Sequence, residues 1–407
     1  MRALRTDLLQ FFRQLQIWED DNSGTCYKKE LENAIGLFLS NGDSKAAEAV
    51  YSAFCRCYWI GTQIKDNPFL QLLAKVREFE SSSGKLVPGQ RDHYVHSVNV
   101  FLLGIVVYFR FEAVRRAVDA KILDRSVYPD SYPTTSEEFL YRWGIASLFH
   151  DIAYPLEISV KQLALYGELL SRYPGDSTAT LGIRLSLDIS SFGHLEALGP
   201  LPEYLVRFEE KYPGWSDINL TDVIDLMARG IADAFCGISH AAARRALMDL
   251  EERMTKQLFI DHGYYGAIIV LRWYYSLVKQ ANWNPAYFYF PIVNSAVAIL
   301  LHNYYRHVLM KEPFNLGPLS IHDHPMAFLL ILCDELQEWN REVYGPKGPG
   351  GPVMELLDVI CEDSGLRLLY SDRGQPHLSR LLDDKSTQIS RILQLDGVLS
   401  LGMEISD

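Results

Sequence analysis

The chain has 407 residues, of which 48% are hydrophobic, 22% charged and 12% aromatic. These proportions are typical of a folded globular protein and exclude disordered and collagen-like chains. The 39 Lys and Arg against 51 Asp and Glu give a formal net charge of -12, which disfavours a large surface for binding long nucleic acid.

The first predicted element is an amphipathic helix over residues 1–21. Charged residues interrupt its apolar positions every few residues, so it lacks the continuous apolar stretch of a secretory signal. The six Cys, at positions 26, 55, 57, 236, 333 and 361, show neither a disulfide-framework spacing nor a complete zinc-site spacing. We therefore expect free thiols and a cytoplasmic protein.

Helical periodicity, with apolar residues three and four positions apart, dominates from residue 1 to about residue 345. Two stretches rich in Gly, Pro and Ser interrupt the chain, SSSGKLVPG at 81–89 and GPKGPGGP at 345–352. We predict a mainly α fold in three segments: an N-terminal helical segment (1–88), a helical domain (89–345) and a small C-terminal α+β module (346–407).

Within the helical domain, several His lie at the ends of strongly apolar helices. His96 lies at the start of the apolar run in RDHYVHSVNVFLLG, and His93, three residues earlier on the same face, is its alternative. We favour His96 because the apolar run begins after it.

A second helix is predicted to start near Ser136, with two carboxylates in its first turn, and to run through WGIASLF into His150-Asp151. Pro155 is expected to end it. An adjacent His and Asp can reach one metal ion, or the Asp can bridge two ions.

Two more His and one Asp lie in similarly apolar surroundings. His262 begins DHGYYGAIIVL, and His302 follows five apolar residues in AVAILLHNYY. The uncharged span 280–305 is long enough to cross a bilayer, but its Pro and Asn residues and His302 indicate a buried core helix, so no membrane partner is expected. Asp334 lies in MAFLLILCDEL, where an unpaired carboxylate is costly and a divalent cation would remove that cost.

The C-terminal module is expected to hold a hairpin, formed by MELLDVICED and LRLLYS around the turn Ser364-Gly365, then a helix and a final strand. Its one His, His377, has no cluster of partners. Docking, oligomer contact and substrate capping are its candidate roles.

In order and context, these motifs resemble the HD-domain superfamily of metal-dependent phosphohydrolases. That family has a His, then His-Asp, then two further His in its two-metal members, and an Asp on a late helix. The resemblance implies that His96, His150 and Asp334 hold one metal ion, that His262 and His302 hold the second, and that Asp151 bridges both.

The chain also departs from the family pattern. The gap from Asp151 to His262 is long, so residues 156–260 are expected to form an inserted helical lobe. The run His262-Gly-Tyr-Tyr-Gly is not the Gly-Tyr-Pro signature of the cyclic-di-GMP-cleaving branch, so that substrate is not implied. If His262 or His302 is not a ligand, the site holds one metal ion, as in nucleotide triphosphohydrolase relatives.

The function implied by the resemblance is hydrolysis of a phosphoester by a metal-activated water, with His150 and Asp151 as catalytic residues. Four imidazoles disfavour magnesium and favour one or two ions of manganese, iron, cobalt, nickel or zinc. We expect a nucleotide or another small phosphorylated substrate. The candidates for binding its phosphate oxygens are Arg91, Lys161, Arg306 and Arg341.

Two other functions remain open. HD-type di-iron oxygenases resemble the same set of six ligands, and a non-catalytic HD module would sense a nucleotide and pass the signal through the C-terminal module. The oligomeric state is also open, including a homo-oligomer.

Overall fold

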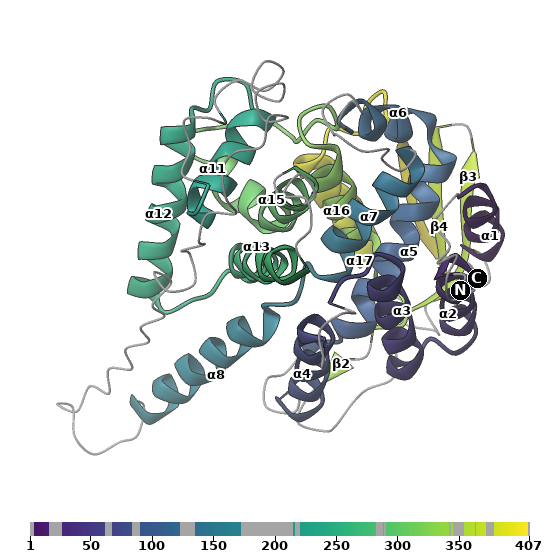
Figure 1. Cartoon of the computed structure of the whole chain (residues 1–407), viewed down its shortest axis with the longest axis horizontal. Coiled ribbons are helices and arrows are strands. Elements are labelled where there is room, and N and C mark those ends of the chain that lie inside the picture. Colours follow the sequence, from purple (N-terminus) through teal and green to yellow (C-terminus); the bar gives the residue numbers. More distant parts are fainter. Residues whose placement is uncertain are drawn as a thin grey trace.

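A computed structural model describes residues 4–15, 27–61, 67–83, 90–122, 135–171, 215, 220–281, 288, 290–341, 343–344, 354–362, 364–371 and 378–405. Within these ranges the protein has fourteen α-helices and a three-stranded mixed sheet near its C-terminus (Figure 1). The predicted mainly α fold with a small α+β module is confirmed.

Four helices precede the first candidate ligand: α1 (Arg5–Gln14), α2 (Tyr27–Asn41), α3 (Ser44–Cys57) and α4 (Pro68–Ser83). The Asp43 carboxylate caps α3 by accepting a hydrogen bond from the backbone N–H of Ala46 at 2.7 Å. The amphipathic α1 buries one face. On this face the Phe11 ring packs edge-on against Tyr108 of α5 (Tyr94–Arg110), with the ring centroids 6.2 Å apart.

The centre of the molecule is built from α5 (Tyr94–Arg110), α7 (Thr135–Leu148), α15 (Pro291–Tyr304) and α16 (Pro325–Leu336). These helices are apolar on nearly every face, and almost all of their residues are buried, as expected of helices inside a core. A short α6 (Glu112–Ala120) follows α5. Residues 282–287 and 289, in the first half of the predicted core helix 280–305, lie outside the described residues, and α15 forms its buried second half.

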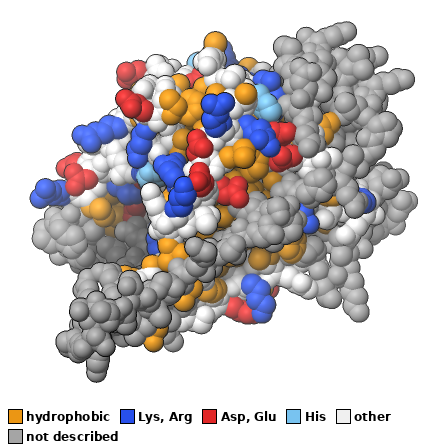
Figure 2. Space-filling model, turned by 90° about the vertical axis from the view of Figure 1, so that its left-hand side faces the viewer, with side chains coloured by type: hydrophobic (Ala, Val, Ile, Leu, Met, Phe, Trp, Pro, Cys, Tyr) orange, Lys and Arg blue, Asp and Glu red, His pale blue; other side chains and the backbone are white. Residues whose placement is uncertain are grey.

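The remaining helices are α8 (Tyr154–Ser171), α11 (Val223–Ala234), α12 (His240–Gln257) and α13 (His262–Ala281), and a π-helical turn, η3 (Tyr305–Leu309), follows α15. The helices α11 and α12 belong to the predicted insertion 156–260 and lie side by side at one edge of the molecule (Figure 1). Most of α8 also belongs to the insertion, but it lies apart from them, on the other side of α13 (Figure 1). On the face that carries α12, Lys and Arg side chains are interspersed with Asp and Glu (Figure 2). Ion pairs there include Arg244 with Asp225 at 2.6 Å.

The predicted role of Pro155 is wrong. The helix α7 ends at Leu148, the chain turns through His150 and Asp151, and Pro155 lies in the first turn of α8. Proline suits that position because the first N–H groups of a helix have no partner inside the helix. His150 and Asp151 therefore lie in a turn between two helices rather than on one helix.

Two small sheets complete the fold. The short β1 (Gln90–Arg91) pairs antiparallel with β2 (Val343–Tyr344). In the C-terminal sheet, β3 (Glu355–Glu362) and β4 (Gly365–Ser371) form an antiparallel hairpin, and β5 (Ser400–Ile405) pairs parallel with β4 after the crossover helix α17 (Leu378–Ile392). The predicted order of hairpin, helix and strand is confirmed.

One hydrophobic cluster runs through the described chain, from Leu4 in the first turn to Met403 in β5. It includes residues of all three predicted segments, whose boundaries stay a prediction because the linker 345–352 lies outside the described residues. No single described helix is long and apolar enough to span a membrane, and α5 and α6 reach that limit only as a pair bent by 99°.

Candidate metal centre

The six predicted ligands come together from five places in the fold. They lie in the first turn of α5, in the turn after α7, at the first residue of α13, and in the last turns of α15 and α16: His96, His150, Asp151, His262, His302 and Asp334. The rings of His96 and His150 are fully buried, and Asp151 is nearly so. Polar groups buried to this extent must be hydrogen-bonded or bind a cation.

Five of these side chains form two groups that could each hold a metal ion. The first is His96, His150 and Asp151, and the second is Asp151, His262 and His302. In each group, one ligand atom from every residue lies within 4.8 Å of the others. We call them the first and the second triad. They overlap at Asp151, so this carboxylate could reach two ions.

The carboxylate of Asp151 divides its oxygens between the two triads. Its Oδ2 lies 3.2 Å from Nε2 of His150, and its Oδ1 lies 3.2 Å from Nε2 of His262. Burial opposes ionisation of Asp151, but the neighbouring rings of His150, His93 and His262 hold its pKa well below the usual range. Asp151 is therefore a carboxylate at neutral pH, as a bridging ligand must be.

Asp334 faces the first triad. Its Oδ1 lies 2.8 Å from Nε2 of His96 and 3.8 Å from Nε2 of His150. Burial again opposes ionisation, but the neighbouring rings of His150 and His96 hold the pKa of Asp334 well below its usual range. The structure thus brings the acidic residue of the late helix to the same centre as the His-Asp pair.

All four imidazoles are oriented in the same way. Each directs Nδ1 to an oxygen acceptor outside the triads and turns Nε2 towards the carboxylates of the centre. The Nδ1–H groups are donated by His150 to the Ser147 carbonyl at 2.8 Å, by His262 to Glu157 Oε2 at 2.5 Å, by His96 to Gln337 Oε1 and by His302 to the Ile299 carbonyl. Such contacts fix the tautomer and the ring orientation of metal-binding histidines.

Two further contacts support these acceptors. The amide nitrogen of Gln337 donates to the carbonyl oxygen of Trp339 at 2.5 Å, which turns Oε1 towards His96. Lys161 forms an ion pair with Glu157 on the outer side of the cluster. A hydrogen bond from His262 holds the pKa of Glu157 at about 2 although burial opposes it.

The Nε2 atoms meet conditions that only a proton or a cation satisfies. Those of His262 and His302 lie 3.0 Å apart, with both Nδ1 hydrogens already used. The buried Nε2 of His150 has no hydrogen-bond partner of adequate geometry within the described ranges. Burial, together with His262 and His150, lowers the pKa of His302 to about 3, so its Nε2 carries a free electron pair. These nitrogen and carboxylate donors could hold a metal ion.

His93, the alternative to His96, also reaches the centre, but in another way. Its Nδ1 lies 2.7 Å from Oδ2 of Asp151, and its ring stacks on Tyr154 with centroids 3.5 Å apart. Burial lowers the pKa of His93 to about 4. The structure therefore places both histidines of the His-x-x-His pair at Asp151, and only His96 belongs to a triad.

The four candidate phosphate ligands are placed differently. Lys161 pairs with Glu157, and Arg306 lies 3.3 Å from the carboxylate of Glu335. The backbone of Arg91 forms part of β1, and its side chain lies outside the described atoms.

Arg341 has a donor that no described group accepts. Its buried Nε has no hydrogen-bond partner in the part of the chain that the structure describes. After burial, the charge of Arg341 is the largest cause that lowers the pKa of His96.

Sequence reasoning missed the residues that orient the rings, above all Glu157 and Gln337. A signal for Glu157 exists, because it lies six residues after Asp151 in the first turn of the next helix. Gln337 lies three residues after Asp334, one helical turn further along the chain.

No family model, curated protein or solved structure matches the chain. What the centre does must therefore be argued from its own geometry.

Proposed function

We propose that the protein is a metal-dependent phosphohydrolase with two transition-metal ions at the overlapping triads. The observation that carries this proposal is the division of the Asp151 oxygens, each 3.2 Å from the Nε2 of a histidine in a different triad. A carboxylate placed in this way is suited to bridge two cations. His96, His150 and Asp334 would hold the first ion, and His262 and His302 the second.

When bound, such ions lower the pKa of a water ligand towards about 7 and neutralise charge on phosphoryl oxygens. The chain's own residues supply position and polarity. The Nδ1 contacts of the four rings hold the ligand atoms in place before substrate arrives. The stacked pair of His93 and Tyr154 forms a wall beside Asp151.

Arg341 supports a phosphorylated substrate in particular. A guanidinium binds phosphate oxygens with directed N–H groups, and a buried Nε without a partner is costly unless a ligand accepts its hydrogen. The substrate class that fits is a small phosphoester, for example a nucleotide, with one phosphate oxygen on Arg341.

The test begins with protein purified without chelator, analysed for metal and screened for phosphatase and phosphodiesterase activity with manganese. The Asp151→Asn variant keeps the size of the side chain and removes its charge, and Asp249→Asn, exposed on α12, is the matched control. We expect two ions per chain and phosphate release in the wild type and the control, and loss of both in Asp151→Asn.

Other outcomes would overturn the proposal. Iron with dioxygen consumption and no phosphate release would identify an oxygenase. Tight nucleotide binding without turnover in the metal-loaded protein would identify a sensor, and absence of metal from every sample would show that the cluster has another role.

The role of Arg341 has its own readout. Arg341→Met should raise the KM for the phosphoester about tenfold or more, through loss of a charge-assisted hydrogen bond, and leave the metal content unchanged. An unaltered KM would remove Arg341 from the substrate site.

A further inference from the structure

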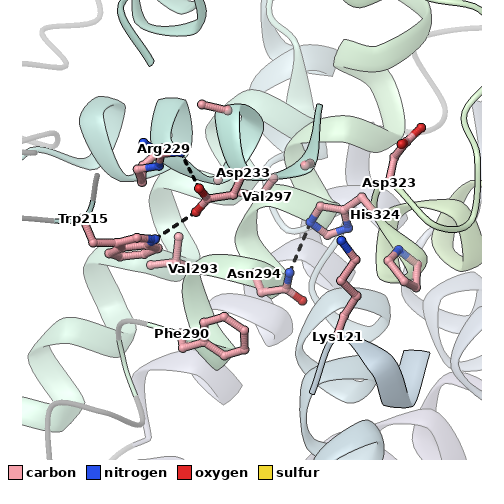
Figure 3. Close-up of a pocket in the computed structure, with 14 residues that line it drawn as sticks. Lys121, Trp215, Arg229, Asp233, Phe290, Val293, Asn294, Val297, Asp323 and His324 are labelled. Atoms are coloured by element: carbon pink, nitrogen blue, oxygen red, sulfur yellow. Dashed lines mark hydrogen bonds and ion pairs between the residues drawn. The ribbon is translucent and has the colours of Figure 1, made fainter. Parts of the chain in front are cut away.

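A cavity of about 330 Å³ lies where α11 meets the beginnings of α15 and α16 (Figure 3). Asn294 lies in the first turn of α15, and His324 is the residue that caps α16. Lys121, at the end of α6, lies beside His324, and Arg229 and Asp233 of α11 line the opposite side.

This cavity is separate from the metal centre but built on the same two helices. His302 follows Asn294 by eight residues, and Asp334 follows Pro325 by nine, which at 1.5 Å per residue places the ligands about 12 Å and about 13 Å further along the helices. The beginnings of α15 and α16 thus face the cavity, and their last turns face the metal triads.

On one side of the cavity, the charge of Asp233 is already paired. Asp233 accepts a hydrogen bond from the indole N–H of Trp215 at 2.8 Å through Oδ2, and its Oδ1 pairs with Arg229 (Figure 3). Both carboxylate oxygens are used. Because Arg229 already balances the charge of Asp233, this side offers an ammonium group little net attraction, which disfavours amines.

The other side carries a cation. Among the described lining residues, Lys121 is the one cationic side chain without an ion pair. The carboxylate of Asp323 points away from it, as Figure 3 shows, and accepts the backbone N–H of Ser320 at 3.3 Å. A negatively charged group of a ligand would therefore be attracted to Lys121.

The polar groups beside Lys121 are donors. Nδ1 of His324 accepts the backbone N–H of Ala327 at 3.1 Å, so the hydrogen of this neutral ring is on Nε2. Nε2 lies 3.4 Å from Nδ2 of Asn294. Because both atoms would then carry hydrogens, the amide must be turned over, so that its oxygen accepts from Nε2 and its NH2 group points away from His324. No side chain caps the first turn of α15, whose N–H groups and dipole favour an anion.

The rest of the lining is apolar. The rings of Trp215 and Phe290 form two of its walls, Val293 lies between them, and Val297 lies beside Asp233 (Figure 3). The volume is at the lower end of the range for ligand pockets, about 300–1,000 Å³, and is suited to a body of one ring or a short branched chain.

We infer that this cavity binds a small organic monocarboxylate, with its carboxylate at Lys121 and the Asn294 amide and its apolar body against Trp215 and Phe290. A dianion such as a phosphate fits less well, because a second negative charge would lie near Asp233 and Asp323 with one unpaired cation to balance it. The site does not depend on the proposed phosphohydrolase activity.

The experiment is a titration of the full chain, by ligand-observed NMR, with phenylacetate as the probe. The comparison compounds are 2-phenylethanol, 2-phenylethylamine and phenyl phosphate, which change the charge of the head group and keep the ring. Phenylacetate should bind more tightly than all three. Lys121→Met should weaken it about tenfold, which is the loss of one charge-assisted hydrogen bond, and Arg116→Met, exposed on the same helix, should not.

A second variant, Trp215→Leu, should weaken phenylacetate and 2-phenylethanol alike, because it removes an apolar wall. The inference is overturned if phenylacetate does not bind at millimolar concentration, if Lys121→Met folds and binds it as the wild type does, or if phenyl phosphate binds more tightly. Far-UV circular dichroism of each variant establishes that it is folded.

Discussion

The Nε2 atoms of His262 and His302 face each other at 3.0 Å, although each ring has already donated its Nδ1 hydrogen to a different acceptor. Two nitrogen electron pairs at this separation repel unless a proton or a cation lies at them. The charges of Asp151 and Glu157 favour the positive species, so this part of the protein is built to hold positive charge.

The ligand set can be divided by substitution. His302→Ala should lower the metal content from two ions to one, because it removes a ligand of the second triad alone. Asp151→Asn should lower the occupancy of both triads. Metal analysis after equilibrium dialysis measures this, with exposed His307→Ala as the control. Two ions retained in His302→Ala would contradict the assignment.

Glu157 should strengthen metal binding by orienting the His262 ring. Glu157→Ala removes the acceptor of the His262 Nδ1–H, and loss of such a contact typically lowers metal affinity 10- to 100-fold. Glu157→Gln retains an oxygen acceptor and should lose less. Lys161→Met removes the partner of Glu157 and leaves His262 bonded, so it is the matched control. Metal competition titrations measure the affinities, and equal values for wild type and Glu157→Ala would count against this role.

Gly263 permits the close approach of α13 to His302. A Cβ atom there would lie 2.9 Å from Cε1 of His302 and 2.9 Å from the Ile299 carbonyl oxygen, so the ring or the helix would have to move. Gly263→Ala should cost about 1–3 kcal/mol in the free energy of unfolding and weaken metal binding at the second triad.

The control is Gly36→Ala in α2, where no atom lies within 4 Å of the added Cβ. Its expected effect is a stabilisation of up to about 1 kcal/mol. Urea denaturation and metal titration are the two measurements. If Gly263→Ala has the stability and the metal affinity of the wild type, the close approach of α13 to His302 does not require a glycine.

His324 should make stability depend on pH. Burial, with the charge of Lys121, lowers its pKa to about 3 in the folded protein, against about 6.5 in an unfolded chain. The contribution of neutral His324 to the free energy of unfolding is fully present above pH 6.5. It is lost as the pH falls, because the unfolded chain binds the proton more readily than the folded protein does.

Between pH 7.5 and pH 5, the loss from this one group is about 2 kcal/mol. His324→Asn keeps a capping side chain for α16 and should remove that part of the pH dependence. His322→Asn, exposed in the same turn, is the control. Urea denaturation at both pH values tests this, and parallel wild-type and His324→Asn profiles would refute it.

The C-terminal module should stabilise the helix that carries Asp334. Lys385 of α17 lies 2.7 Å from Glu335 and 3.1 Å from the buried Glu338, both close to Asp334 in the chain. Lys385→Met should cost about 1–3 kcal/mol of unfolding free energy. Arg367→Met breaks an exposed pair with Glu362 in the same module and should cost less than about 1 kcal/mol. Equal denaturation midpoints for the two variants would contradict the difference.

The sequence predicts those residues of the centre that are polar but lie within strongly apolar helices. Asp334 follows nine apolar residues in its helix, and His302 ends another apolar run. Burying a polar side chain in such a run is costly, and a bound cation would offset that cost. The C-terminal hairpin was predictable because a turn separates two short apolar runs.

The contacts that orient the rings were not predictable in the same way. Gln337 is joined to His96 across 241 positions, and Glu157 to His262 across 105, so no local spacing links them. The acceptors at Ser147 and Ile299 are backbone carbonyl groups, which every residue has, so the residue type does not reveal their role. Each lies three positions before the histidine that it orients. Pro155 was misinterpreted because a helix end and a helix start both favour proline near a turn.

The distance along the chain between His96 and Asp334 also sets an order of assembly. They are 238 residues apart, and the second triad is complete once His302 has been synthesised. During translation, Asp151, His262 and His302 are available before the helix of Asp334 exists. Asp334, which faces the first triad, is therefore the last of the six candidate ligands to be synthesised, and the centre is complete only when α16 packs against α5.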